Sequence, residues 1–141
     1  MSEPPTNAPT LAVANVHKTY RQGPRTLEVL SGASLAVASG EMVALVGPSG
    51  SGKSTLLHIA GLLERPGQGV IRLAGTDCAA LGETERTRRR GRDIGFVYQY
   101  HHLLPEFSAH ENLVLPQLII GTGRRAAAER ADELLDAVGL A

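Results

Sequence analysis

The sequence predicts an α/β fold in which a β-rich N-terminal part precedes a buried strand, a glycine-rich loop and a helix. Residues 42–46 form an uninterrupted apolar run that ends at Gly47, which is typical of a buried strand. Residues 47–55 follow, and they fit the pattern G-x-x-x-x-G-K-[ST]. Apolar residues then recur at helical spacing up to Leu63. Because a strand and a helix flank the motif in this order, the sequence predicts a phosphate-binding P-loop rather than a chance turn.

The residue types of this loop suit a polyphosphate ligand. The loop consists of Gly47, Pro48, Ser49, Gly50, Ser51, Gly52, Lys53, Ser54 and Thr55. Its glycines let the backbone approach the ligand closely, so that successive N–H groups form an anion-binding nest. The following helix adds its free N–H groups and the positive end of its dipole. We expect Lys53 to reach the β- and γ-phosphates and the Ser54 hydroxyl to ligate Mg²⁺.

The composition bounds the class of protein. The chain has 141 residues, of which 43% are apolar, and its formal net charge is zero, which argues against a dedicated nucleic-acid binder. Cys78 is the only cysteine, so no disulfide framework exists, and we expect a small buried or half-buried residue. No run approaches the length of a membrane span, so membrane association would need a partner. Residues 1–10 are predicted to be a disordered leader without a signal peptide, and residues 11–141 a single domain.

The remaining elements follow from periodicity and turn residues. Strands are expected at residues 11–20, 26–30, 34–37, 69–73 and 93–99, the last of them buried, with a turn at residues 22–24. Helices are expected at residues 83–90, 111–120 and 126–138. Pro116 predicts a kink or a break in the second of these helices, and Gly139 ends the third.

One stretch points to a family. Residues 95–107 read Gly-Phe-Val-Tyr-Gln-Tyr-His-His-Leu-Leu-Pro-Glu-Phe, and Glu111 and Asn112 follow shortly after. With the P-loop, this stretch makes the chain from Leu11 onward resemble the ATP-binding subunits of ABC transporters, most of all those of the lipoprotein-releasing (Lol) type. Macrolide exporters and cell-division ATP-binding subunits carry similar stretches. The resemblance implies an ABC-type nucleotide-binding domain with an N-terminal antiparallel β subdomain.

The resemblance also implies roles for single residues. Tyr20 matches the aromatic residue that stacks on adenine, whereas the residue alone fits an ordinary strand-end tyrosine equally well. Gln99 matches the glutamine that links Mg²⁺ or the attacking water to the transmembrane partner. Residues 99–112 match the surface that receives the membrane subunit. Within this surface, an apolar cluster would either contact that partner or pack on its own domain; it contains Leu103, Leu104, Pro105 and Phe107.

Two further clusters have less specific interpretations. His101 and His102 are adjacent and lack a cysteine or a histidine at helical spacing, so they are a poor metal-ligand set. A basic run would either contact anionic lipid or an acidic partner, or form a solvated helix face, which the neutral chain favours; it contains Arg86, Arg88, Arg89, Arg90 and Arg92.

The family pattern continues beyond Ala141 with a signature loop, a Walker B aspartate, a catalytic glutamate and a switch histidine. The chain contains none of these, so we expect a truncated domain that binds Mg-ATP but hardly hydrolyses it. The longer protein would form an ATP-dependent homodimer at the cytoplasmic face of the inner membrane. A kinase or GTPase is the less favoured alternative because residues 1–41 precede the P-loop strand. A nucleotide-binding module that never hydrolyses ATP is the third.

Overall fold

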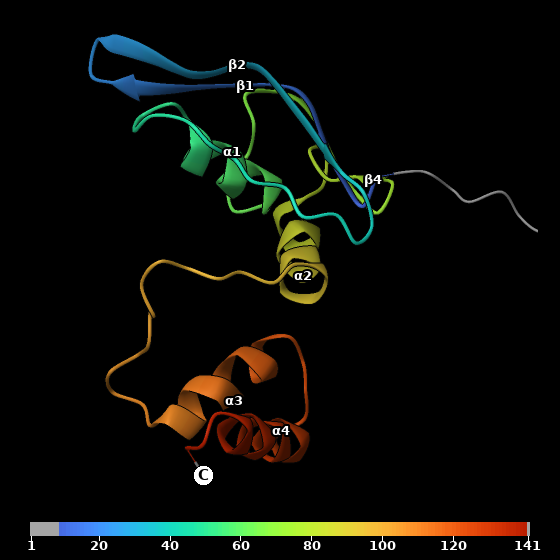
Figure 1. The fold of residues 1–141 in the computed structure, drawn as a ribbon, viewed down its shortest axis with the longest axis vertical. Helices are drawn as coiled ribbons and strands as arrows, with labels where there is room; N and C mark the ends of the chain where they lie inside the picture. The colour runs from blue at the N-terminus through green and yellow to red at the C-terminus, as the bar shows by residue number, and fades with distance from the viewer. Residues whose placement is uncertain (1–8, 141) are drawn as a thin grey trace, which may run out of the picture. The chain divides into compact units, whose positions relative to one another are not determined.

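The computed structural model describes residues 9–140, and the chain divides after Arg90 into two compact units (Figure 1). The predicted leader lies, in its residues 1–8, outside the described residues. The elements are β1 (Leu11–Gln22), β2 (Arg25–Val37), α1 (Lys53–Ala60), β3 (Gln68–Leu73), β4 (Thr76–Asp77), α2 (Glu83–Asp93), α3 (Ala109–Ile119) and α4 (Arg124–Ala137). Among the helices of residues 9–140, none has the length and apolar character that a membrane crossing requires.

The first unit contains an antiparallel sheet with the strand order β2-β1-β3-β4. This sheet confirms the predicted N-terminal antiparallel subdomain. Strands β1 and β2 form a hairpin whose turn contains Gly23, with φ of 60°. The two strands expected at residues 26–30 and 34–37 are one continuous strand. Val16 pairs with Ala33 and Lys18 with Leu30, so β2 absorbs the extra residue as a bulge instead of breaking.

Helix α1 packs on β1 and β2 and covers the apolar face of the sheet (Figure 1). The buried apolar side chains of this core are Val13, Val16, Leu30, Leu56, Ile59, Ala60, Leu62, Ile71, Leu73 and Cys78. Cys78 is therefore a buried core residue, as the sequence predicts. The helix expected up to Leu63 ends earlier, at Ala60, because Gly61 caps it and Leu62 adopts φ of 60°.

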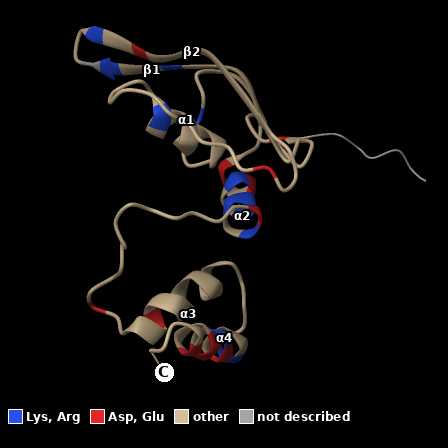
Figure 2. Cartoon of the chain, in the orientation of Figure 1, with Lys and Arg blue, Asp and Glu red and all other residues tan. Residues whose placement is uncertain are grey.

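Arginines gather on α2 (Figure 2), but the predicted solvated face is wrong for the first of them, Arg86. Arg86 is 3% exposed and donates to the carbonyl oxygens of Leu62 and Glu64, at 3.0 Å each, and to the carboxylate of Glu83. Arg90 also donates to the Leu62 carbonyl, at 2.9 Å. Arginine side chains from the first turns of α2 therefore donate to the carbonyl groups that follow α1. A guanidinium group suits this role because it carries several N–H donors.

Two predicted buried strands are absent. Residues 42–46 have no regular secondary structure, and Met42 and Val46 are 98% and 84% exposed. Residues 94–98 are also irregular, with Val97 fully exposed. Both predictions are wrong for this structure because a strand needs neighbouring strands for its backbone groups, and the sheet of the described residues pairs neither segment.

In the second unit, α3 and α4 pack against each other. Ser108 caps α3 by accepting from the Glu111 N–H, while the Glu111 carboxylate accepts from the Ser108 N–H at 2.8 Å, which makes a capping box. The helix continues through Pro116, so the break that the sequence suggests there does not occur. Helix α4 agrees with the predicted helix and buries Ala127 and Ala131.

Candidate functional site

The loop of residues 47–55 wraps around the start of α1. Its last glycine, Gly52, has φ of 85° and ψ of 5°, a left-handed conformation that favours glycine. A Cβ atom there would lie 2.8 Å from the carbonyl oxygen of Val29 and 2.9 Å from Cδ2 of Leu30. Both the backbone angle and the close approach of β2 therefore require glycine at position 52.

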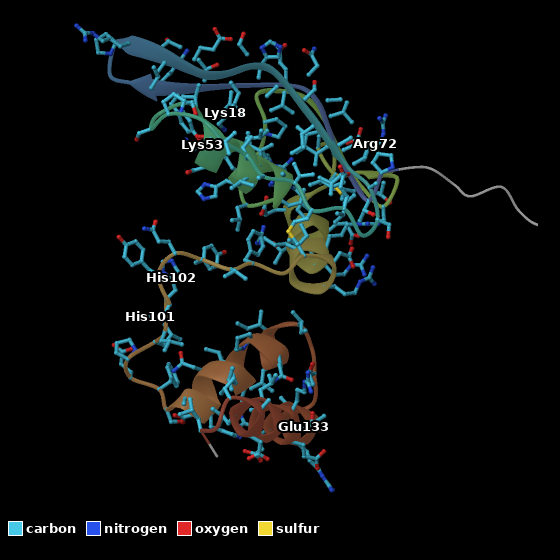
Figure 3. The ribbon with its side chains drawn as sticks, viewed as in Figure 1. Lys18, Lys53, Arg72, His101, His102 and Glu133 are labelled. Carbon is cyan, nitrogen blue, oxygen red and sulfur yellow. The ribbon has the colours of Figure 1, made fainter. Side chains whose placement is uncertain are left out.

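Lys53 lies at the centre of the loop. Its ammonium donates to the carbonyl oxygens of Gly47, at 2.8 Å, and Pro48, at 2.6 Å, and lies 3.4 Å from the hydroxyl of Ser51. Figure 3 shows its position at the start of α1. The positive charge is therefore held within the loop by neutral acceptors, which places it for an anionic ligand that offers stronger, charge-assisted hydrogen bonds.

A pocket of about 270 Å³ lies over the same loop. Its lining consists of Val29, Ser49, Gly50, Gly52, Lys53, Ser54 and Thr55. The first helical hydrogen bond runs from the Leu56 N–H to the Gly52 carbonyl, so the N–H groups of residues 53–55 precede the helical ladder. Ser54 is exposed and offers one hydroxyl oxygen, which suits Mg²⁺ because this ion takes few protein ligands besides phosphate oxygens and water.

Tyr20 lies near the end of β1, partly buried, beside the polar groups that follow α1. Its hydroxyl donates to Oε2 of Glu64 at 2.7 Å. The ammonium of Lys18 lies 5.2 Å from the centre of the tyrosine ring, 2.7 Å from Oε1 of Glu64 and 2.8 Å from the Arg65 carbonyl oxygen. We call Lys18, Tyr20 and Glu64 the tyrosine network; its lysine is labelled in Figure 3.

The pKa values of Tyr20 and Glu64 are shifted in opposite directions. Burial, followed by the hydrogen bond to Glu64, raises the pKa of Tyr20, while a polar interaction with Thr55 acts in the opposite direction. The pKa of Glu64 is lowered: burial alone would raise it, but the hydrogen bonds from Lys18 and Tyr20 together outweigh that contribution. At neutral pH Tyr20 therefore keeps its proton and donates to an ionised Glu64.

Gln99 belongs to the second unit, where it is exposed and lies in an irregular stretch. Aromatic rings flank it: those of Phe96 and Tyr98 stack at 5.6 Å, and His102 contacts Tyr98 edge-on at 5.1 Å. His101 accepts from the Leu103 N–H through Nδ1. The two histidines thus take part in ring and backbone contacts, and within residues 9–140 no three metal-ligating side chains gather.

The loop that follows Gln99 is organised by one amide side chain. Asn112 accepts from the Leu104 N–H at 2.9 Å and donates to the carbonyl oxygens of Leu104, Phe107 and Ser108 at 2.9–3.1 Å. The apolar cluster of this loop is at the surface: Leu103 is 58% exposed and Phe107 is 43% exposed.

Three residues of this description were missed by the sequence reasoning. Glu64 and Lys18 hold Tyr20, and no sequence spacing could have found them because 44 positions separate Tyr20 from Glu64. The role of Asn112 as loop organiser was also missed. Here a signal existed, because Ser108 and Glu111 stand at the spacing of a capping box and so mark where the loop ends.

Comparison with known proteins places these features in a family. The family model described as "ABC transporter" matches residues 30–141. The lipoprotein-releasing system ATP-binding protein LolD of Paramagnetospirillum magneticum is 61% identical over 131 residues, which cover 93% of this chain and 58% of that protein. LolD 1 of Rhodospirillum rubrum is 58% identical over 92% of this chain, and LolD of Bordetella pertussis is 50% identical over the whole chain. The chain spans about three fifths of the length of these relatives.

Solved structures agree with this grouping. Two dimeric structures of the cassette MJ0796, one of them in a post-hydrolysis state bound to ADP and Pi, match with a TM-score of 0.80 and 36% identity. The match covers 89% of this chain and 56% of that protein. The fold is therefore that of an ABC ATPase cassette, of which the chain contains part.

Proposed function

The chain belongs to the ABC transporter family, and we propose that it binds ATP with Mg²⁺ through residues 47–55 as part of a transporter's ATP-binding subunit. The observation that carries this proposal is the ammonium of Lys53, held by two loop carbonyls at the start of a helix whose first N–H groups precede the helical ladder. A triphosphate would accept from both kinds of donor. The base would stack on Tyr20.

Each residue has a distinct task in this proposal. Lys53 exchanges a carbonyl partner for a phosphate oxygen, and Gly52 keeps the backbone close enough for its neighbours' N–H groups to reach the same anion. The Ser54 hydroxyl would hold Mg²⁺, and the family resemblance adds Gln99 as a second proposed ligand. The metal supplies charge neutralisation between the phosphates when it is bound.

The names of similar proteins support a proposal for the cargo. LolD proteins are named as ATP-binding proteins of a lipoprotein-releasing system, and 61% identity over 131 residues supports the same cargo for this protein. We therefore assign the longer protein to lipoprotein release at the cytoplasmic face of the bacterial inner membrane, with macrolide-exporter and cell-division ATPases as the alternatives. Its dimeric structural neighbours support an ATP-dependent homodimer.

Hydrolysis belongs to the longer protein. The chain has a phosphate cradle but lacks the acidic strand end and signature loop that the family resemblance assigns to the reaction, so we propose that these 141 residues bind ATP and hydrolyse it feebly. The membrane subunit would bind residues 99–112. The exposed apolar side chains of Leu103 and Phe107, presented by the loop that Asn112 holds, support this assignment.

Replacing Lys53 tests the proposed site. Lys53→Ala in the full-length protein removes hydrogen bonds from a charged donor, worth about 1.5–3 kcal/mol, so ATP affinity falls by about ten- to 100-fold. Isothermal titration calorimetry with ATP and Mg²⁺ measures the change. Arg125→Ala is the matched control, because this side chain is 93% exposed and its carboxylate partner is Glu129 on the same helix. Equal affinity of Lys53→Ala and the unaltered protein would rule out the phosphate role of this loop.

A further inference from the structure

We propose that Glu64 is a positioning residue for nucleotide binding: it fixes the ring of Tyr20 at the angle at which a purine base stacks on it. This inference rests on the proposed function and extends it to a residue outside the P-loop. The Tyr20 hydroxyl donates to Oε2 of Glu64 at 2.7 Å, which ties the ring to the segment that follows α1.

The ring of a tyrosine near a strand end would otherwise rotate about two side-chain torsions. The bond to Glu64 holds the far end of the ring, and the ammonium of Lys18, two positions earlier on the same strand, lies over its face. Because the ammonium of Lys18 lies over one face of the ring, we assign the base to the opposite face. The network therefore selects both the angle and the face of the stacking surface.

Glu64 can act as a rigid anchor because its own backbone is held. Its N–H donates to the His58 carbonyl at 3.2 Å, and its carbonyl accepts from the buried Arg86 at 3.0 Å. Lys18 contacts the other carboxylate oxygen of Glu64 at 2.7 Å and also the Arg65 carbonyl. Two hydrogen bonds thus hold the backbone of Glu64, and Lys18 orients its carboxylate toward the tyrosine hydroxyl.

The same short helix links this anchor to the phosphate cradle. Residues 53–60 form α1, whose first turn holds the ammonium and hydroxyl groups of the loop, and Glu64 follows its end. The phosphates would therefore be held at the start of α1, and the residue that orients Tyr20 for the base follows the end of the same helix. Loss of the Glu64 contact should loosen the base subsite while the cradle stays intact.

Binding of two different ligands can distinguish the base subsite from the phosphate cradle. ATP occupies both, whereas inorganic tripolyphosphate has no base and reports on the cradle alone. We expect Glu64→Ala in the full-length protein to weaken ATP binding by about threefold to tenfold, because a misoriented ring keeps part of the contribution of a base–aromatic stack, and to leave tripolyphosphate affinity unchanged. Titration calorimetry of both ligands with Mg²⁺ measures this. Glu28→Ala, which removes an exposed carboxylate on β2 that contacts His17, is the matched control and should change neither affinity.

Tyr20→Phe keeps the ring and removes only the hydroxyl, so it should reproduce the effect of Glu64→Ala. The double variant should show no further loss, because both changes break the same contact. If Glu64→Ala does not fold, Tyr20→Phe carries the test, and ATP affinity that equals that of the unaltered protein overturns the proposal. Equal loss for ATP and tripolyphosphate in Glu64→Ala overturns it too, since Glu64 would then support the loop as a whole. An unaltered protein that binds neither ligand would instead refute the proposed function.

Discussion

Two apolar regions of this chain differ in exposure although their sequences both predict strands. In β1, Val13 and Val16 are 2% and 0% exposed, because β2, β3 and α1 surround them. At residues 42–46, Met42 and Val46 are almost fully exposed. An apolar run therefore becomes a buried strand only where other segments supply both hydrogen bonds and a covering layer.

The largest expected effect is the loss of stability when a buried side chain of the sheet is truncated, compared with the same change in residues 42–46. Ile71→Ala deletes most of a side chain that is 1% exposed in β3, and we expect the chain to lose about 2–5 kcal/mol of unfolding free energy. Met42→Ala, at a 98% exposed position, should change it by no more than about 0.5 kcal/mol. Urea unfolding followed by circular dichroism measures both.

Ile71→Ala and Met42→Ala can also be compared in the full-length protein. If segments beyond residue 141 pair with residues 42–46, Met42→Ala becomes costly there, by more than about 1 kcal/mol. A negligible cost in both chains would mean that this segment stays unpaired, and the buried-strand prediction would then fail for the longer protein as well.

The second test asks which exposed apolar side chains bind a partner. Leu103→Asp together with Phe107→Asp places carboxylates in the apolar cluster, so we expect the membrane subunit to lose at least about 2 kcal/mol of binding free energy. Co-purification from membranes reports this loss, and titration with ATP should show unchanged nucleotide binding. Ile119→Asp, at a 73% exposed position on α3, is the control for a general effect of added charge. Retained co-purification of the double variant would mean that Leu103 and Phe107 do not contact the membrane subunit.

The sequence predicted well whatever depends on local patterns. The helix start at the end of the glycine-rich loop, the hairpin turn at Gly23 and the end of α4 at Gly139 depend on neighbouring residues, and all three agree with the structure. The helix start at Ser108 was missed although its capping pattern is local as well.

Features that depend on distant residues could not be predicted in this way. Arg86 looked like part of a charged surface, yet it is buried because carbonyl groups of Leu62 and Glu64 require a donor there. The contact between Tyr20 and Glu64 has the same origin, since it joins a strand end to a turn far along the chain. The strand predictions at residues 42–46 and 93–99 failed for a related reason, because the pattern does not say whether neighbours are present.

The smallest expected effect is the pH dependence of the unfolding free energy that the carboxylate of Glu64 contributes. The pKa of Glu64 lies below its ordinary value of 4.5 in the folded chain, despite partial burial, because Lys18 and Tyr20 donate to the ionised carboxylate. A lowered folded pKa adds stability above the ordinary value, and this contribution is lost as the pH falls through the folded pKa. Glu64→Gln, which stays neutral, should therefore be less stable than the unaltered chain at about pH 6, by at most about 1 kcal/mol, and the difference should be smaller at about pH 3. Urea unfolding at both pH values measures the difference, with Glu28→Gln as the control for the loss of one carboxylate. A difference that persists or grows in acid would mean that the ionised carboxylate of Glu64 does not stabilise the junction between β1 and the end of α1.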